Sequence, residues 1–380
     1  MQTEIDVLVV GAGPAGLATA LGLAQSGIDF RIVDALGEAQ NTSRAAVIHA
    51  ATLETLSRLG VGEKLIQQGL RVPDFRVRER DRILLEADFR RLGGPTPFAL
   101  MIPQDETEVI LVDALAANGH RVEREQRVLA AERTSGGARV TLSRHGGEET
   151  ILARFVVGAD GEKSTIRAVA DINFPGSSYG SFLLADVRMD WPLPLTEVSL
   201  FFDRGGTLVV APMSGDRFRV VAQEPNAPAH PTVADVQRLV DERGPSHGTQ
   251  VRDVIWGSRF QVHHKLADRF HDGPFLLVGD AAHVHSPAGG QGMNLGLRDA
   301  EALAHAIAAT VAGNGDEPLR RYASERRAAA SMVLDRTDRL TRLATTRSTA
   351  LRWVRNGALL TLGRAAPVRD RIARMLAGFA

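Results

Sequence analysis

The stretch of residues 5–34, IDVLVVGAGPAGLATALGLAQSGIDFRIVD, decides the fold. It opens with an apolar, β-branched run that is typical of a buried parallel strand. Glycines then follow in the pattern GxGxxG at positions 11, 13 and 16, before a segment with helical spacing and a second strand that ends in Asp34. This order of strand, glycine turn, helix, strand and acid predicts a Rossmann-like βαβ unit.

The same unit predicts a dinucleotide ligand. The glycines allow a tight turn, backbone contact with a pyrophosphate and close packing of helix on strand. The start of the helix offers free N–H groups and its positive dipole end to phosphates, and Asp34 can accept hydrogen bonds from a ribose. The unit leaves FAD and NAD(P) open, and the competing interpretation is a glycine-rich turn in an unrelated α/β protein.

A second segment, residues 279–294 with the sequence GDAAHVHSPAGGQGMN, favours FAD. It follows the apolar strand FLLV and precedes a long helical pattern. Asp280 is placed to bind a ribityl hydroxyl, and Pro287 with the GGQG run brings backbone N–H groups to a planar ring edge. The start of the following helix, near Met293, would stabilise negative charge on a reduced isoalloxazine.

Two shorter segments add to this site. Residues 158–167, GADGEKSTIR, again follow an apolar strand, and Asp160 is expected in a turn near the pyrophosphate. Gln104 begins a helical pattern in IPQDETEVILVDAL, where its amide can bind ribityl or phosphate oxygens.

With these motifs in order, the chain resembles the class A flavoprotein aromatic monooxygenases, the group of p-hydroxybenzoate, phenol and aromatic polyketide hydroxylases. The matching motifs are GxGxxG at 11–16, DGxxSxxR at 160–167 and GDAAHxxxPxGGQGxN at 279–294, and the resemblance covers about residues 1–310. It is expected to be a short form, without the C-terminal thioredoxin-like domain of the larger phenol and polyketide hydroxylases.

The resemblance implies a cofactor site and a chemistry. Residues expected to bind the cofactor are Gly11, Gly13, Ala15, Gly16, Asp34, Arg44, Gln104, Val128, Asp160, Asp280, Pro287, Gly290, Gly292, Met293 and Asn294. Arg44, His285 and Pro287 would lie near the flavin face, and no side chain is assigned as catalytic. FAD, reduced by NADPH or NADH as a transient co-substrate, would react with O2 to a C4a-hydroperoxide that hydroxylates a phenolic or polyketide-type aromatic substrate.

The expected fold is α/β, or α+β overall, with three parts. Residues 1–72, 98–172 and 262–330 would form a discontinuous FAD-binding domain, and residues 73–97 and 173–261 an inserted, mostly antiparallel substrate-binding sheet. The residues expected to face the substrate are Phe201, Val210, Pro212, Met213 and Phe218, although a shift of one residue in register would reverse every face. Residues 331–380 would form Arg-rich C-terminal helices packed on the FAD-binding domain.

Composition limits the alternatives. The 380 residues contain 45 Lys+Arg, 45 Asp+Glu and no cysteine, which argues against nucleic-acid binding and excludes thiol chemistry and Cys-ligated metals. No His or carboxylate set has metal-ligand spacing, and no apolar run is long enough for a membrane span. We therefore expect a cytoplasmic monomer or homodimer without stable membrane insertion.

Two other functions remain open on the same fold. One is an FAD-dependent reductase or dehydrogenase, and the other is a non-catalytic FAD-binding auxiliary protein. The sequence favours a multi-ring phenol as substrate but leaves a simple phenol or a heteroaromatic open.

Overall fold

The computed structural model describes residues 3–38, 45–144, 146–285, 289–344, 349–363 and 365–379. Its first part is an eight-stranded sheet whose main path has the strand order β17-β18-β11-β1-β2-β8. The strands are β1 (Thr3–Val10), β2 (Phe30–Val33), β8 (Val122–Glu123), β9 (Arg127–Thr134), β10 (Gly137–Arg144), β11 (Gly147–Gly158), β17 (His271–Asp272) and β18 (Phe275–Leu277). Strands β1, β2, β8, β11 and β18 pair in parallel, so the predicted Rossmann-like core is confirmed.

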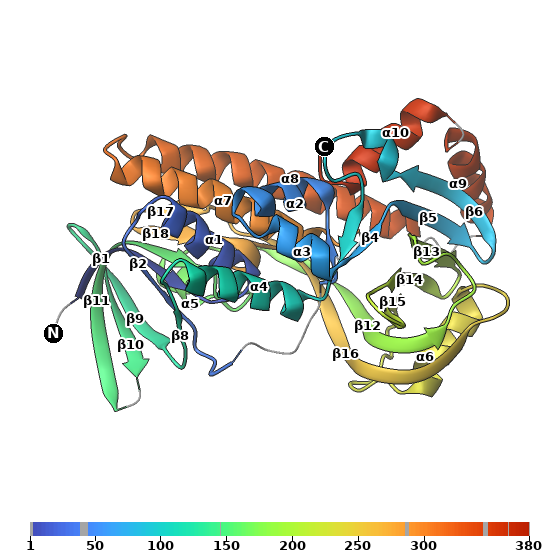
Figure 1. The fold of residues 1–380 in the computed structure, drawn as a ribbon, viewed down its shortest axis with the longest axis horizontal. Helices are drawn as coiled ribbons and strands as arrows, with labels where there is room; N and C mark the ends of the chain where they lie inside the picture. The colour runs from blue at the N-terminus through green and yellow to red at the C-terminus, as the bar shows by residue number, and fades with distance from the viewer. Residues whose placement is uncertain are drawn as a thin grey trace.

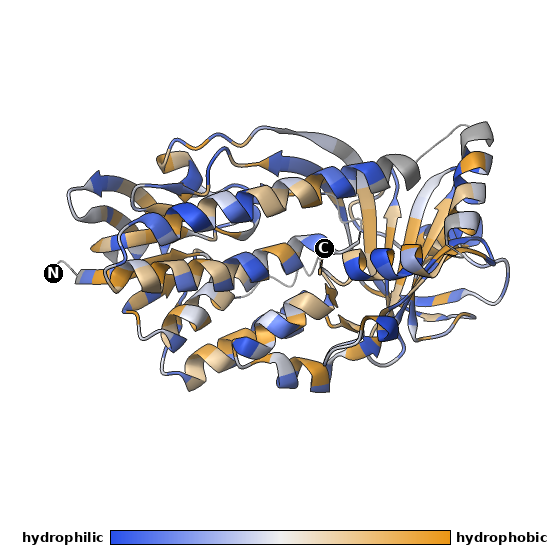
Figure 2. Ribbon diagram, turned by 90° about the horizontal axis from the view of Figure 1, so that it is seen from above, coloured by the Kyte–Doolittle hydropathy of each residue, from blue (hydrophilic) through white to orange (hydrophobic). Residues whose placement is uncertain are grey.

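Helices cover this sheet and extend beyond it (Figure 1). They are α1 (Pro14–Gln25), α2 (Ala50–Arg58), α3 (Gly62–Gln68), α4 (Gln104–Ala117), α5 (Thr165–Val169), α7 (Gln291–Val311) and α8 (Glu317–Ala344), with the short 3₁₀ turn η2 (Gly279–Ala281). Pro14 stands in the first turn of α1, where its missing N–H costs no helical hydrogen bond. In Figure 2 these helices interleave hydrophilic with hydrophobic residues, as expected for helices with one buried face.

A second eight-stranded sheet has the order β19-β16-β12-β15-β14-β13-β5-β6. Its strands are β5 (Asp74–Glu79), β6 (Arg82–Asp88), β12 (Gly176–Asp190), β13 (Glu197–Asp203), β14 (Gly206–Pro212), β15 (Arg217–Gln223), β16 (Gln250–Leu266) and β19 (His283–Val284). Only the β13–β5 pairing among them is parallel, which confirms the mostly antiparallel sheet. A small sheet of β3 (Val47–Ile48), β7 (Ala99–Met101) and β4 (Leu70–Val72) and the turn η1 (Phe89–Leu92) lie in the connecting chain.

The second sheet is covered on both faces (Figure 1). Helix α6 (Val233–Arg243) packs on one face, where Val236, Leu239 and Val240 join a buried cluster with strand residues. Helices α9 (Thr349–Leu362) and α10 (Ala366–Leu376) lie over the other face and contact β6 and η1. The expectation that residues 331–380 pack on the FAD-binding domain is therefore wrong for α9, which packs on the second sheet, whereas the end of α8 continues the long helix beside α7. Helix α10 contacts β6 and η1, but its end also meets α2 of the expected FAD-binding domain, where the Ala51 N–H donates to the Ala377 carbonyl at 3.1 Å.

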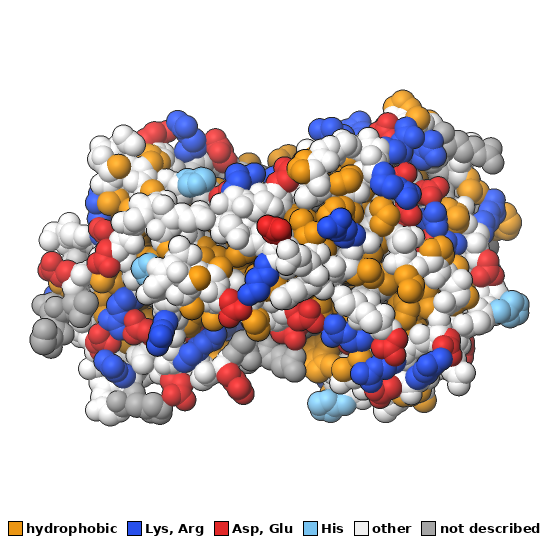
Figure 3. All heavy atoms as spheres, viewed as in Figure 1, with side chains coloured by type: hydrophobic (Ala, Val, Ile, Leu, Met, Phe, Trp, Pro, Cys, Tyr) orange, Lys and Arg blue, Asp and Glu red, His pale blue; other side chains and the backbone are white. Residues whose placement is uncertain are grey.

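Acidic and basic side chains are interspersed on the face shown in Figure 3. None of the helices in the described ranges is both long and apolar enough to cross a membrane. Within those ranges no cluster of His, Cys, Asp and Glu side chains forms a group suited to a metal ion.

Glu197 is a buried charge on which the second sheet depends. Its carboxylate is fully buried at the start of β13, where it accepts hydrogen bonds from Arg78 at 2.9 and 3.0 Å and from Ser199 Oγ at 2.6 Å, and it also pairs with Arg76. Both arginines stand on the neighbouring strand β5, so this one carboxylate links the two strands.

We expect Glu197→Gln to lower the free energy of unfolding by about 3 kcal/mol, because it leaves buried arginine charge uncompensated. Urea unfolding followed by circular dichroism measures the loss. Glu242→Gln is the matched control: Glu242 pairs with Arg238 at 3.2 Å on the exposed face of α6, and its loss should cost less than about 1 kcal/mol. Equal effects of the two changes would contradict the prediction.

Candidate functional site

The glycine-rich loop before α1 contains two glycines that pack closely against backbone atoms and one glycine beside open space. Gly11 has φ +103°, and a Cβ there would lie 2.3 Å from the carbonyl oxygen of Ala159. A Cβ on Gly16 would lie 1.9 Å from the oxygen of Gly11. A Cβ on Gly13, in contrast, would meet nothing within 4 Å. The loop therefore packs tightly at Gly11 and Gly16, and the open space at Gly13 leaves room for a ligand phosphate at the start of the helix.

Asp34 holds this loop in place through hydrogen bonds to its backbone. One carboxylate oxygen accepts a hydrogen bond from the Ala12 N–H at 2.7 Å, and the other accepts one from the Leu36 N–H at 2.9 Å. Each carboxylate oxygen has more than one lone pair, so these bonds leave acceptor capacity for a ribose hydroxyl. Asp34 thus orients the phosphate-binding turn whether or not it also contacts the ribose.

Two distant motifs meet the same loop. A Cβ on Gly279, in η2, would lie 2.8 Å from the Cβ of Ala15, and the neighbouring Asp280 side chain is exposed. On the other side, a Cβ on Gly11 would lie 2.9 Å from the Cα of Asp160. The structure therefore brings together the three motifs that the sequence predicts to bind the cofactor.

Asp160 shows an unsatisfied polar atom at this point. Its Oδ2 accepts the N–H groups of Thr165 at 2.7 Å and Ile166 at 3.2 Å, at the start of α5. Its Oδ1 is buried and finds no hydrogen-bond donor among the described residues. Burial raises the pKa of this carboxyl. A ligand hydroxyl at this place would satisfy the orphaned oxygen.

Gln104 and Val128 contact other residues of the fold. The Gln104 side chain accepts a long hydrogen bond from the Ala45 N–H at 3.4 Å and donates to Glu108 at 2.8 Å, while its own N–H donates to the Ala45 carbonyl. It therefore anchors the chain that leads into β3. Val128 is buried in the core and lies opposite Leu142 in the β9–β10 pair.

Asn294 connects the start of α7 to the chain before α2. Its side-chain oxygen accepts the His49 N–H at 2.8 Å, and its side-chain N–H groups donate to Val47 O at 2.8 Å and Gly290 O at 2.7 Å. Gly290 has φ +63°, and a Cβ there would lie 2.2 Å from Val47 Cγ1. Gly292 and Met293 stand in the first turn of the same helix, partly exposed. Arg44 and Pro287 lie outside the described residues.

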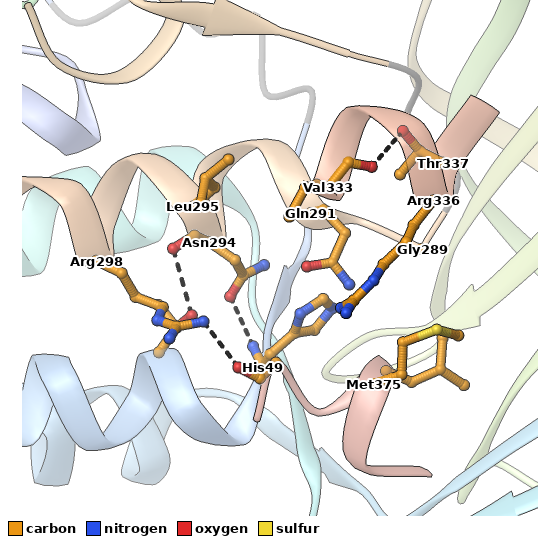
Figure 4. Close-up of a pocket in the computed structure, with 13 residues that line it drawn as sticks. His49, Gly289, Gln291, Asn294, Leu295, Arg298, Val333, Arg336, Thr337 and Met375 are labelled. Carbon is orange, nitrogen blue, oxygen red and sulfur yellow. Dashed lines mark hydrogen bonds between the residues drawn. The ribbon is translucent and has the colours of Figure 1, made fainter. Parts of the chain in front are cut away.

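His49 is a residue that the sequence analysis missed, because one histidine in an apolar run carries no distinctive spacing. It is 4% exposed and lies under the start of α7, with Asn294 and Gln291 directed toward it (Figure 4). Burial lowers the pKa of His49 to about 4, an effect that Arg298 strengthens and that contacts with Gly289 and Gln291 oppose. The imidazole is therefore neutral at physiological pH.

The two histidines of the 279–294 motif lie apart. His283 is buried, and its Nε2 bonds to Asp299 at 2.7 Å, while Arg326 binds the other oxygen of that carboxylate. Although burial raises the pKa of Asp299, Arg326 and His283 outweigh it and the pKa is lowered. His283 thus belongs to a buried ionic group of the fold. The ring of His285 lies toward α7, with Cε1 3.9 Å from the position of a Cβ on Gly292.

A cavity of about 270 Å³ adjoins this site. It lies between the second sheet, helices α9 and α10, and the segments at Val47, His49 and Gly290. Its lining is almost entirely apolar, and its size is near the lower end of ligand pockets, about 300–1,000 Å³. The residues that the second sheet and its edge contribute are Phe75, Val77, Leu85, Phe182, Val198, Leu200, Phe202, Thr207, Val209, Ala211, Arg219 and Val221.

The predicted substrate residues lie elsewhere. Phe201, Val210 and Phe218 point to the opposite face of the sheet, where they join the core against α6. Met213 belongs to a cluster with Ala46 and Ala211 beside the cavity, and Pro212 ends β14; neither is among the residues that line it. The cavity-lining residues of β13 and β14 are shifted by one position, which is the register reversal that the period-2 pattern leaves open.

Beside the cofactor site, the charged groups at the end of the cavity compensate each other. Arg219 is buried, binds both oxygens of Asp186 at 2.7 Å and donates to the Ala45 carbonyl at 2.6 Å. The bidentate pair holds β15 against β12 and fixes the segment at Ala45. With His49 neutral, this end of the cavity carries no net charge from these residues.

A dinucleotide site whose three motifs meet at one helix start, beside a cavity with a largely apolar lining, defines a flavoprotein oxidoreductase. FAD fits this site on two observations: the open space at Gly13 and the orphaned Oδ1 of Asp160. The model of the family described as "FAD binding domain" matches residues 4–337, so the chain belongs to that family.

Relatives refine the family. The chain is 35% identical over 355 residues to an uncharacterized aromatic compound monooxygenase, YhjG, of Bacillus subtilis (strain 168), covering 90% of this chain and 69% of the relative. The structure of OxyS, an anhydrotetracycline hydroxylase from Streptomyces rimosus, matches with a TM-score of 0.81 at 31% identity, covering 99% of this chain and 76% of that one.

The fold of p-nitrophenol 4-monooxygenase PnpA from Pseudomonas putida DLL-E4 matches with a TM-score of 0.90 at 24% identity, covering 100% and 99% of the two chains. The resemblance to the class A flavoprotein aromatic monooxygenases is confirmed, and the protein is an FAD-dependent monooxygenase. NAD(P)H as co-substrate is typical of the family.

Gly13→Val should yield folded protein that lacks FAD, because the new side chain enters the open space without meeting the chain. The absorbance of bound flavin at purification and the thermal unfolding midpoint of the cofactor-free protein measure the two effects. Gly16→Ala is the contrasting change: its Cβ meets Gly11 O, so we expect about 2 kcal/mol or more of lost stability. Stoichiometric FAD in Gly13→Val would contradict this assignment.

The buried His49 predicts a pH dependence of stability. Its pKa is about 4 in the folded protein against about 6.5 when unfolded, so its stabilising contribution is present above pH 6.5 and is lost as the pH falls toward 4. Relative to His49→Gln, the wild type should lose about 2.5 kcal/mol of unfolding free energy between about pH 7.5 and about pH 4.5. Urea titrations at both pH values measure this, with the exposed His230→Gln as control. An unchanged difference between wild type and His49→Gln would refute it.

Proposed function

We propose that the enzyme hydroxylates a phenolic or polyketide-type aromatic substrate held in the 270 Å³ cavity, with NADPH or NADH as reductant. One observation carries the proposal: Gly289 and Gly290, in the motif expected at the flavin edge, also line the apolar cavity. The named relatives, an aromatic compound monooxygenase and an anhydrotetracycline hydroxylase, support an aromatic substrate.

The residues at the dinucleotide site have distinct tasks in this proposal. The start of α1 with Gly13 would hold the pyrophosphate, and Asp34 would contact the adenosine ribose, with Val128 near the adenine. Gln104, Asp160 and Asp280 would bind the ribityl–pyrophosphate region. The first turn of α7, with Gly292 and Met293, would direct backbone N–H groups toward the flavin, and Arg44, His285 and Pro287 would lie near its face. Bound FAD supplies the reaction with dioxygen.

The protein's own part in the reaction is to position the substrate and exclude water. Apolar side chains from β5, β13, β14 and β15 form the floor of the cavity, and α9 and α10 close it from the other side. Such a lining keeps reactive oxygen species away from bulk water. Arg219 and Asn294 fix the two wall segments, at Ala45 and at Val47 with Gly290, that adjoin the cofactor site.

We further propose the division of the chain into residues 1–72, 98–172 and 262–330 for FAD binding, and residues 73–97 and 173–261 for the substrate. Strand β16 crosses the boundary between residues 261 and 262 without interruption and ends at Leu266. We also propose a cytoplasmic monomer or homodimer that binds no nucleic acid. The family membership does not favour a reductase, a dehydrogenase or a non-catalytic FAD-binding protein.

The cavity assignment is tested by two changes on opposite faces of the second sheet. Val209→Phe fills the cavity and should lower kcat/KM for NAD(P)H-dependent hydroxylation at least about tenfold, with FAD retained. Phe201→Leu lies in the core against α6, so it should cost about 1–2 kcal/mol of stability and leave kcat/KM unchanged.

A panel of one- to four-ring phenols supplies the substrate, and product mass confirms the addition of one oxygen atom. Loss of kcat/KM in Phe201→Leu but not in Val209→Phe would place the substrate on the other face. Substrate-dependent turnover without oxygen would contradict monooxygenation.

A further inference from the structure

A second, smaller pocket of about 40 Å³ lies beside the start of α7, where α8 and the end of α10 approach it (Figure 4). A single water molecule needs about 10–15 Å³ of such space, so the pocket has room for a few waters or one small ion. His49, Gly289, Met375 and Leu376 line both this pocket and the apolar cavity. The two spaces therefore share part of one wall.

Among the described residues, the lining of this pocket contains two arginines and no carboxylate. The arginines are Arg298 of α7 and Arg336 of α8, and the other polar side chains are those of His49, Thr52, Gln291, Asn294 and Thr337. In Figure 4 the ring of His49, the amide of Gln291 and the guanidinium of Arg336 are directed toward one another. Guanidinium, amide and imidazole groups all donate N–H hydrogen bonds. A lining of donors with positive charge suits an anion.

The acidic groups near Arg298 are bound by other arginines. Asp299 and Glu301 favour the cation of Arg298. Asp299, however, pairs with Arg326. Glu301 pairs with Arg58, with 2.7 Å between the nearest nitrogen and oxygen atoms. The two pairing arginines in turn disfavour the cation of Arg298, so these pairs as units do not compensate its charge.

The potential in the pocket is positive. Burial is the main cause that lowers the pKa of Arg298. Burial also lowers the pKa of His49 to about 4, and the charge of Arg298 contributes to that shift. The first turn of α7 contains no acidic residue, and no side chain caps it. The positive end of this helix therefore adds to the potential and would stabilise a bound anion.

Donors remain available in the pocket. Within the described part of the chain, Arg298 makes one hydrogen bond, from Nη1 to the Gly378 carbonyl at 2.7 Å. A guanidinium has more N–H groups than this one, so others are left for a ligand. His49 is 4% exposed, and its Nδ1 is buried with no hydrogen-bond partner among the described residues, which is unusual for a buried polar atom.

We propose that this pocket binds a small monovalent anion of the size of chloride or nitrate, held by Arg298 with His49 and Gln291 as further donors. The volume of about 40 Å³ suits such an ion and excludes an aromatic acid. The ion would lie behind the wall that the pocket shares with the cavity and would hold Gly289 and Gln291 of the 279–294 motif in place. This site is distinct from the proposed substrate cavity and does not depend on what the cavity binds.

Crystals of the FAD-loaded enzyme grown with sodium bromide test the location of the ion. Bromide replaces chloride at sites of this kind and has an anomalous signal of its own. We expect an anomalous peak in the pocket beside Arg298 in the wild type and none there in Arg298→Met. A pocket that holds only water in the bromide crystals would overturn the proposal.

Thermal unfolding tests the same site in solution. The midpoint of the FAD-loaded enzyme is measured in sodium chloride and in sodium gluconate at equal ionic strength, because gluconate is too large for the pocket. An ion that binds only the folded protein stabilises it, so we expect a midpoint at least about 2 °C higher in chloride. The difference between the two salts is the readout, and a general loss of stability in a variant does not remove it.

Variants assign the chloride effect to one residue. Arg298→Met should lose it, and Arg298→Lys, which keeps a cation, should retain part of it. Arg320→Met is the matched control, because Arg320 pairs with Asp316 and Glu317 at the exposed start of α8 and does not line the pocket. It should keep the full chloride effect.

The outcomes separate this proposal from the cavity assignment. Equal midpoints in the two salts, or a chloride effect that persists in Arg298→Met, would overturn the anion site. A bromide peak without any effect in solution would overturn it too, since the ion would then bind at crystal concentration only. Val209→Phe, which fills the cavity, should keep the chloride effect, and its loss there would place the ion in the cavity instead. No aromatic substrate enters these measurements, so failure of the hydroxylation test leaves the anion site standing, and the reverse also holds.

Discussion

The arrangement of the site depends on one buried amide, that of Asn294. It stands in the first turn of α7 and bonds at once to the His49 N–H, the Val47 carbonyl and the Gly290 carbonyl. Because an amide has both donors and an acceptor, it can bind one backbone N–H group and two backbone carbonyl groups, on two segments of the chain, and satisfy all of them. An aspartate of the same shape would lack the two N–H donors.

The consequences of this connection extend to both ligand sites. It fixes the distance between α7, whose start faces the cofactor site, and the β3–α2 segment, which forms a wall of the cavity. The contact is so close that Gly290 has no space for a side chain against Val47. The sequence predicts that Asn294 binds the cofactor; in the structure its side chain also connects the start of α7 to a wall of the cavity.

Much of the fold was predictable because its signals are local. A side chain at Gly11 would collide with the backbone of Ala159, and one at Gly16 would collide with the backbone of Gly11. Both positions therefore require glycine, and the spacing of the glycines alone predicts the turn. The inward face of the second sheet was not predictable in the same way. Both faces of β13 and β14 are apolar, since α6 covers one and the cavity, α9 and α10 border the other, so the alternation that normally marks a face is absent.

The C-terminal helices were predicted, but what they pack against was not, for a related reason. An Arg-rich amphipathic pattern indicates that a helix has one buried face but does not say against what it is buried. Here Leu359 and Ile372 are partly buried against the second sheet, and Arg355 lines the cavity with them. From composition alone, Arg355 would be counted as one more exposed arginine. In the structure it is buried and lines the cavity.

The end of the cavity beside the cofactor site carries no net charge from the residues that border it there. The Arg219–Asp186 pair is neutral as a unit, and burial keeps His49 uncharged. Charge that develops on a reacting ring at this end therefore meets no fixed net charge from these groups. The contribution of the protein is then to position the ring against the flavin, and such positioning requires no catalytic side chain at the reacting carbon.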